Sequence, residues 1–234
     1  MNFSSRWMIA ALAAAVAMVG CSKQQEPVAP ASAPEPVVAA PAAPATTSAP
    51  PAAPVADAAS PVNDERAAAI EAALAEEEIV SDARGQFAVG ATGSSTYGDK
   101  APDSQSSYTP FAATGVPNVE KYSDNGNSWA TATPDKGIEW LEVTFGRPVQ
   151  ATQIRIRQNY NPGAIIKVEL IAERGSKQTV WQGVDDQAYA PGTIGWFDRS
   201  FDKTTDKIKG ARITLATNAV PGWNEIDAVQ LLGD

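Results

Sequence analysis

The chain has 234 residues but no histidine and only one cysteine, Cys21. Without histidine, the sequence cannot form a Ser-His-Asp triad, a Cys-His pair or a zinc site with histidine ligands. With one cysteine, it cannot form an internal disulfide. Basic residues are also few, since 18 Lys and Arg stand against 27 Asp and Glu for a net charge of −9. This balance argues against nucleic acid or an anionic lipid surface as the partner, because both attract basic surfaces.

The first 21 residues have the composition of an export signal. The segment MNFSSRWMIAALAAAVAMVGC has a short basic start at Arg6, an apolar run over residues 7–19 and small residues before Cys21. The apolar run is about half to two-thirds of the roughly 20 residues that a membrane-spanning helix needs. We therefore expect residues 1–21 to be a signal peptide and not a transmembrane helix.

The end of this segment, MVGC, resembles the lipobox of bacterial lipoproteins, with Met18 where leucine is usual. The resemblance implies that Cys21 is lipidated and becomes the first residue of the mature protein. Ser22, which is not acidic, then implies sorting to the outer membrane. We expect a bacterial outer membrane lipoprotein whose domain faces the periplasm or the cell surface. An ordinary secretory peptide with an unrelated cysteine is the alternative.

Residues 22–62 form a segment rich in proline and alanine, as in PVAPASAPEPVVAAPAAPATTSAP. Frequent proline blocks helix and sheet and favours extended polyproline II. We expect a disordered, semi-rigid linker that reaches at most on the order of 100 Å. A ligand for a proline-recognition domain is the alternative.

Residues 63–84 predict a short helix. Asn63 suits the N-cap, and Ile70 and Leu74 share one face in an otherwise thin apolar stripe. We expect this helix to be free in solvent or to rest lightly on the domain that follows. A helix that binds a partner is the alternative.

The remaining residues, 85–234, predict one domain built of β-strands. Strand-length runs are separated by Gly, Pro, Asn and Asp, with no long amphipathic helix between them. The predicted strands cover residues 140–145, 152–158, 164–172, 178–182, 211–216 and 225–232. Apolar and polar residues alternate in several of these runs, which is typical of half-buried strands. The pattern predicts an all-β fold, an antiparallel β-sandwich.

Several ordered blocks of this domain resemble the discoidin or coagulation-factor type C group. The blocks, within residues 87–233, include SSTYGD, ATGVPNVEKYSDNGNSWATA, IEWLEVTFGRPVQATQIRIRQNYNPGAIIKVELI, TVWQG and VPGWNEIDAVQLLG. The resemblance implies a galactose-binding-like jelly roll. This fold serves sugar binding, phospholipid binding and protein adhesion, so the resemblance does not identify the ligand.

The resemblance also implies a structural calcium ion between an Asp/Asn/Gly loop and a Glu at the start of the last strand. The residues that match are Asp124, Asn125, Asn127, Ser128 and Glu225. Calcium takes about 6 to 8 oxygen ligands, backbone carbonyls included, and tolerates irregular geometry. The alternative is a turn rich in Asn, Asp and Gly that forms for conformational reasons alone.

Asp227 lies in the apolar last strand and needs a partner there. A strict two-residue period places it on the same inner face as Val229. Because an unpaired buried carboxylate is costly, we expect it to pair with Arg155, Arg157 or Arg212, or with backbone amides.

Candidate ligand-binding residues lie on loops that we expect at one end of the sandwich: Tyr160, Asn161, Trp196 and Trp223. Aromatic faces beside amide and guanidinium donors suit sugar rings, which present apolar patches ringed by hydroxyl groups. The same side chains also suit core packing, and Asn161-Pro162-Gly163 is a tight turn. Both interpretations stay open.

Catalysis in a chain without histidine has to use carboxylates, such as Glu225 with Asp124 or Asp227. The resemblance gives these acids other roles and the chain has no second catalytic domain, so we expect no enzyme activity. We predict a membrane-anchored, noncatalytic module that binds a glycan or another cell-envelope component, with calcium as a structural cofactor. The alternative is a structural or adhesion module that binds another protein or itself.

Overall fold

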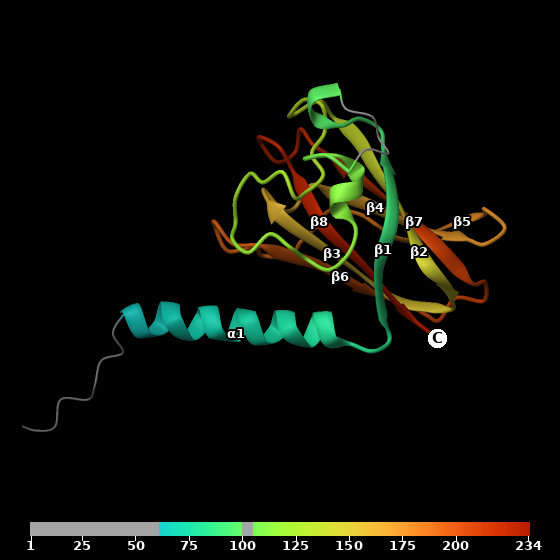
Figure 1. Ribbon diagram of the computed structural model, residues 1–234, viewed down its shortest axis with the longest axis horizontal. Helices are drawn as coiled ribbons and strands as arrows, with labels where there is room; N and C mark the ends of the chain where they lie inside the picture. The colour runs from blue at the N-terminus through green and yellow to red at the C-terminus, as the bar shows by residue number, and fades with distance from the viewer. Residues whose placement is uncertain (1–60, 100–104) are drawn as a thin grey trace, which may run out of the picture. The chain divides into compact units, whose positions relative to one another are not determined.

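The computed structural model describes residues 61–99 and 105–234 (Figure 1). The predicted signal peptide, the lipidated Cys21 and nearly all of the predicted linker, residues 22–62, lie outside these ranges. In the described ranges, no helix is both long and apolar enough to cross a membrane.

Helix α1 (Pro61–Ser81) begins and ends slightly earlier than the predicted helix over residues 63–84 and leads into the first strand (Figure 1). Ile70 and Leu74 are 50% and 60% exposed, so the thin apolar stripe does not pack on the domain. The contacts of α1 are instead polar. The Glu76 carboxylate lies 2.8 Å from an Arg157 guanidinium nitrogen, and the Ile79 carbonyl accepts a hydrogen bond of 2.8 Å from Gln230 Nε2. Of the two expected arrangements, a helix free in solvent or one resting lightly on the domain, these few contacts correspond to the second.

The predicted antiparallel β-sandwich is confirmed. Its strands are β1 (Gly85–Gly93), β2 (Ile138–Val149), β3 (Ala151–Tyr160), β4 (Ile165–Ala172), β5 (Lys177–Gln182), β6 (Gly195–Ser200), β7 (Ile208–Ala216) and β8 (Glu225–Gly233). The strands pair in the order β5-β4-β7-β2-β1-β8-β3-β6, and every pair is antiparallel. Strands β1 and β6 were not predicted. Two 3-10 turns, η1 (Tyr97–Asp99) and η2 (Pro110–Ala113), lie between β1 and β2.

Strand β1 joins the two halves of the sandwich. Its residues 85–87 pair with β8 and its residues 88–93 pair with β2, with an irregular register between Ala88 and Gly90. Such an irregularity bends a strand and increases its twist, which lets one strand serve both sheets. At the far edges, the Trp181 ring of β5 meets the Phe197 ring of β6 edge-on at 4.8 Å. The core is therefore closed on both sides.

The core contains the alternating apolar side chains of the strands. On β2, Leu141 and Val143 are completely buried, and on β3 the same holds for Ile154 and Ile156. Each such side chain contributes about 1.5–3 kcal/mol of stability on burial. The predicted inward faces of these strands are confirmed.

The predicted inner face of β8 is wrong for Asp227. Arg157 pairs with Ala228 and Gln158 pairs with Ile226, so Asp227 is the extra residue of a β-bulge. The bulge shifts the alternation by one residue, which is why Ile226 and Val229 both lie in the core. Asp227 therefore points away from the core.

Arg157 pairs with Asp227 on that outer face. Its Nη1 lies 2.7 Å from the Asp227 carboxylate and also donates a hydrogen bond of 2.8 Å to the Val119 carbonyl. Both side chains of the pair are almost inaccessible to solvent, at 3% for Arg157 and 0% for Asp227. Burial raises the pKa of Asp227 above its ordinary value, although Arg157 opposes that shift. The pairing was predicted for one of three arginines, and the structure identifies which one.

Candidate ligand-binding end and acidic cavity

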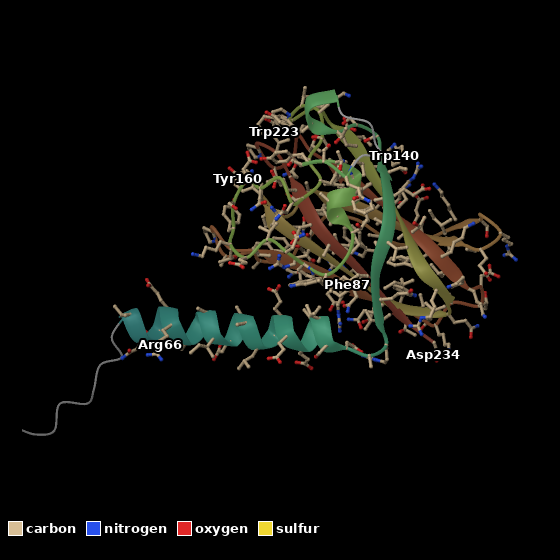
Figure 2. All side chains as sticks on the ribbon, viewed as in Figure 1. Arg66, Phe87, Trp140, Tyr160, Trp223 and Asp234 are labelled. Carbon is tan, nitrogen blue, oxygen red and sulfur yellow. The ribbon has the colours of Figure 1, made fainter. Side chains whose placement is uncertain are left out.

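Two loops meet at one end of the sandwich, the one that follows β3 and the one that precedes β8. Tyr160 and Trp223 lie at this end, away from the C-terminal Asp234 (Figure 2). Asn161 has a positive φ of 43°, a conformation that asparagine tolerates better than most residues. Its Nδ2 donates to the Trp223 carbonyl at 3.0 Å, and Asn224 Nδ2 donates to the Asn161 carbonyl at 2.9 Å. These two hydrogen bonds fix the loops to each other.

Asn161 also connects two groups of aromatic rings. Tyr122 donates its phenol hydrogen bond to Asn161 Oδ1 at 2.8 Å, and its ring lies 5.1 Å from the Tyr160 ring. On the other side, the Trp223 ring meets Tyr97 edge-on at 5.6 Å. All of these side chains keep part of their surface exposed. Tyr160, Asn161 and Trp223 were predicted as ligand-binding residues, and the structure brings them together.

Trp196, the fourth predicted ligand-binding residue, lies on strand β6. It pairs with Arg157 across β6 and β3, and the Arg157 guanidinium lies 6.0 Å from its ring centroid. It lines a groove of about 460 Å³ together with alanines of α1 such as Ala69 and Ala73. Tyr122 lines this groove as well, so the groove extends from the helix to the aromatic rings of the loop end.

A small cavity of about 50 Å³ lies next to Trp223. It is lined by Tyr97, Tyr108, Asp124, Ala130, Trp223 and Glu225. Glu225 and Ala130 are each 1% exposed and form its floor, whereas Asp124 is exposed and Tyr97 is 42% exposed. The Tyr97 and Tyr108 rings lie 5.0 Å apart. The cavity thus combines aromatic walls with one buried and one exposed carboxylate.

Glu225 is held at the floor through only one of its two oxygens. Oε2 accepts hydrogen bonds from Asn125 N at 3.1 Å, Ser128 Oγ at 2.6 Å and Asn159 Nδ2 at 2.9 Å. Oε1 is buried and has no hydrogen-bond partner among the described residues. Burial raises the pKa of Glu225 to about 7, because loss of water disfavours the charge more than the three donors restore it, and the charge of Asp124 adds to the rise.

Asp124 is oriented at the rim by a tyrosine. The Tyr108 hydroxyl donates to Asp124 Oδ1 at 2.7 Å. This hydrogen bond is the main reason why the pKa of Tyr108 rises to about 12, so the phenol stays neutral at physiological pH. Tyr108 and Tyr97 were not predicted as site residues, since the segment between β1 and β2 has no periodic pattern that would show which of its aromatic rings meet.

The predicted calcium ligands come together only in part. Ser128 and Glu225 are in direct contact, but Asp124 is bonded to Tyr108, and Asn125 Oδ1 accepts from Asn127 N at 2.9 Å in a local turn. Among residues 61–99 and 105–234, no three acidic side chains gather where they could hold a metal ion.

Asn159, which was not predicted, is a second reason against calcium in this arrangement. Its Nδ2 lies among the oxygens, 3.1 Å from the Ser123 carbonyl, 3.3 Å from Ser128 Oγ and 2.9 Å from Glu225 Oε2. Calcium needs about 6 to 8 oxygens, and N–H donors directed at the same carboxylate oxygen repel a cation. The donor set in this structure does not fit calcium, and calcium binding stays a prediction.

Solved structures similar to this chain are small β-sandwich modules. The family 32 carbohydrate-binding module of Clostridium perfringens NanJ, in complex with galactose, is 18% identical, with a TM-score of 0.44 over 63% of this chain and 98% of that chain. An F5/8 type C domain from Bacteroides fragilis is 13% identical, with a TM-score of 0.46 over 65% and 98% of the two chains. F5/8 type C is the group that the sequence resembles.

The sequence comparisons give one family. No curated protein matches the chain. Residues 79–234, from the end of α1 to the C-terminus, match the family described as Pappalysin-1, SD scarf domain, C-terminal. The match covers well over half of the 234 residues and includes the complete sandwich. The chain belongs to the family of the C-terminal SD scarf domain of Pappalysin-1.

Proposed function

We propose that the sandwich is a noncatalytic glycan-binding module that binds its ligand at the loop end. The observation that supports this most is the position of Asn161, which joins the Tyr122–Tyr160 pair to Trp223. Partly exposed rings next to fixed amide groups offer stacking surfaces for the apolar face of a sugar and hydrogen bonds for its hydroxyl groups. Because the amides are already bonded to the loops, the surface is organised before the ligand arrives.

The size of the acidic cavity supports binding without hydrolysis. In a glycosidase, two carboxyl groups flank the scissile bond at a separation of about 5–10 Å, with the sugar between them. Asp124 and Glu225 both line the cavity, but about 50 Å³ does not admit a sugar ring. This size is the reason why we expect the two acids to take part in binding and not in hydrolysis.

The alternative function, binding of another protein, is favoured by one feature of α1. Val62, Ile70 and Leu74 are all at least half exposed on this helix, at 71%, 50% and 60%. Ile70 and Leu74 are four residues apart and share a face, which is the spacing of a helix that docks into a partner. In this function the helix, and not the loop end, is the binding surface.

We also propose that the module is tethered to the outer membrane through Cys21, with the linker as a spacer. This rests on the resemblance of MVGC to a lipobox. In bacteria fed with radioactive palmitate, the wild-type protein should become labelled and fractionate with outer membranes. Cys21→Ala should lose the label and move to the soluble fraction. An unlabelled wild-type protein would contradict the anchor.

A glycan array followed by tryptophan fluorescence titration tests the glycan function. The full-length protein should bind a subset of glycans saturably, and Trp223→Ala and Tyr160→Ala should each weaken binding by about tenfold, or about 1.4 kcal/mol. Trp140→Ala is the matched control, because Trp140 lies on β2 with its ring 4.1 Å from the Arg212 guanidinium. A blank array, or equal losses in Trp140→Ala and Trp223→Ala, would refute the proposal. Discrete crosslinked partners lost on Leu74→Ser would favour protein binding.

A further inference from the structure

The cavity beside Trp223 has at its buried end a carboxyl group, that of Glu225, with one oxygen that the described residues do not satisfy. Glu225 lines the cavity and is 1% exposed, and its Oε1 is buried without a hydrogen-bond partner among the described residues. A buried carboxylate oxygen is costly to leave unpaired, since it has lost its water and gained nothing in return. The three groups that do bond to this side chain, Asn125 N, Ser128 Oγ and Asn159 Nδ2, are neutral and meet at the other oxygen. A hydrogen-bond donor on a bound ligand would therefore satisfy this oxygen.

The rest of the lining favours a positive charge on that donor. The six lining residues include two acids and no lysine or arginine. Asp124 adds a second negative charge at the exposed rim, where the Tyr108 hydroxyl orients it. Tyr97, Tyr108 and Trp223 form the walls, and aromatic rings attract cations through the negative potential of their faces. A neutral or anionic group gains much less from these surroundings.

The volume of the cavity and the free oxygen of Glu225 favour a small cation with N–H donors. About 50 Å³ is room for on the order of three or four water-sized groups, enough for an ammonium and the carbon that bears it. A primary ammonium has three N–H donors, one of which can satisfy Glu225 Oε1. A quaternary ammonium has no N–H to donate, and a calcium ion needs about 6 to 8 oxygens where aromatic rings now stand.

We propose that this cavity binds the protonated primary amine of an amino sugar, with the amine between Glu225 and Asp124 and within the walls formed by Tyr97, Tyr108 and Trp223. The identification of a sugar as the carrier rests on the proposed glycan function. Trp223 belongs both to the cavity and to the loop end joined by Asn161, so a sugar whose amine enters the cavity has its ring next to that surface. An ethanolamine headgroup carries the same ammonium chemistry and is the other source that the experiment has to separate.

The test is a titration of the full-length protein at pH 7, followed by calorimetry and tryptophan fluorescence, with glucosamine, N-acetylglucosamine, ethanolamine, tetramethylammonium and calcium chloride as separate probes. We expect glucosamine to bind about tenfold more tightly than N-acetylglucosamine. Glu225→Gln and Asp124→Asn should each remove most of that preference. Asp186→Asn is the matched control, because it removes the same charge from a side chain that is 94% exposed on another part of the surface. If Glu225→Gln does not fold, Asp124→Asn decides, since Asp124 is exposed.

Each remaining outcome separates this inference from the glycan function. Equal affinities for the two sugars would overturn the amine site and leave the glycan function intact. Binding of ethanolamine without either sugar would support the amine site and overturn the glycan function. Tetramethylammonium binding as tightly as ethanolamine would overturn the role of the N–H donors. Calcium that binds through Glu225 and displaces glucosamine would replace the amine site with a metal site.

Discussion

Replacing Arg157 by methionine is expected to destabilise the sandwich strongly. Arg157 is 3% exposed and is bonded to Asp227, which is completely buried on the bulge of β8. Methionine keeps much of the apolar stem but leaves the Asp227 carboxylate without its cation. Loss of one member of a buried ion pair costs about 3–5 kcal/mol, mostly because the other charge is left in a nonpolar environment. This is a large share of the roughly 5–15 kcal/mol that stabilises a typical domain.

Urea denaturation of the wild type, Arg157→Met and the double variant Arg157→Met/Asp227→Asn measures this cost. The double variant should recover a large part of the loss, since it removes the uncompensated charge. The single variant should also lose less stability at pH 5 than at pH 7, because an unpaired Asp227 takes up a proton as the pH falls. Both expectations follow from burial of the carboxylate and not from the number of hydrogen bonds.

A matched control uses an arginine pair that stays in contact with solvent. Arg212 and Glu142 lie 2.8 Å apart with side chains about 30% exposed, and such pairs are worth about 0–1 kcal/mol. Arg212→Met should therefore cost far less than Arg157→Met. A loss below about 1 kcal/mol in Arg157→Met, or equal losses in the two variants, would refute the reasoning. A double variant less stable than Arg157→Met would refute it as well.

Three further predictions concern Glu225, its loop and the packing of β7. Folding raises the pKa of Glu225 from 4.5 to about 7, so the folded state holds a proton that the unfolded state has lost. The contribution of Glu225 to stability should therefore fall by about 3 kcal/mol as pH rises from 4.5 to 7, measured as the difference in pH dependence between the wild type and Glu225→Gln, and equal pH dependence of the two would contradict it. Because Asn159 lies among the oxygens, millimolar calcium should leave the melting temperature unchanged within about 1 °C. A rise in melting temperature that Glu225→Ala removes would contradict this and support a calcium site instead. Gly210→Ala should lower the free energy of unfolding by about 1–3 kcal/mol, because the added Cβ would lie 2.6 Å from the Val143 carbonyl oxygen. An unchanged denaturation midpoint would show that β7 shifts away from β2 without loss of stability.

The strands that the sequence predicts are those whose stability comes from alternating large apolar residues. In β2 this alternation is regular, and the structure buries the predicted face. In β4 the predicted face is buried at Val168 and Leu170, but Ile165 and not Ile166 is buried at its start, because the register shifts between Ile165 and Lys167. Strand β1, GQFAVGATG, contains mostly small residues and pairs with two different strands, so its extended form depends on its neighbours and not on its own pattern. Strand β6 is short and carries Asp198 and Arg199 on half-buried positions. Tertiary pairing, which a local pattern does not contain, decides both strands.

The candidate site was predictable where a motif joins residues that are close in the chain. Tyr160 and Asn161 belong to one turn, and Trp223 stands just before the last strand, so their place at a loop end follows from the order of the strands. The rings of Tyr97 and Tyr108 come from an irregular segment, and only the folded chain shows that Tyr97 meets both Tyr108 and Trp223. Trp196 also stands next to a loop in the sequence, and only the folded chain shows that strand β6 carries it to the groove beside the helix, which Tyr122 also lines.

The two carboxylates of β8 differ in function because their surroundings differ in charge. Asp227 meets Arg157 directly, so its charge is compensated within the fold and its role is to hold β8 against β3. Glu225, two residues earlier on the same face, meets only neutral donors, and those reach one oxygen. Each acid has one buried oxygen without a hydrogen-bond partner among the described residues, but Asp227 has a cation beside it, whereas Glu225 has none and lines a cavity with aromatic walls. A buried carboxylate without a cation lowers the stability of the folded state. Binding of a cationic group at the cavity would raise that stability again. For this reason Glu225, and not Asp227, is the acid to test for ligand recognition.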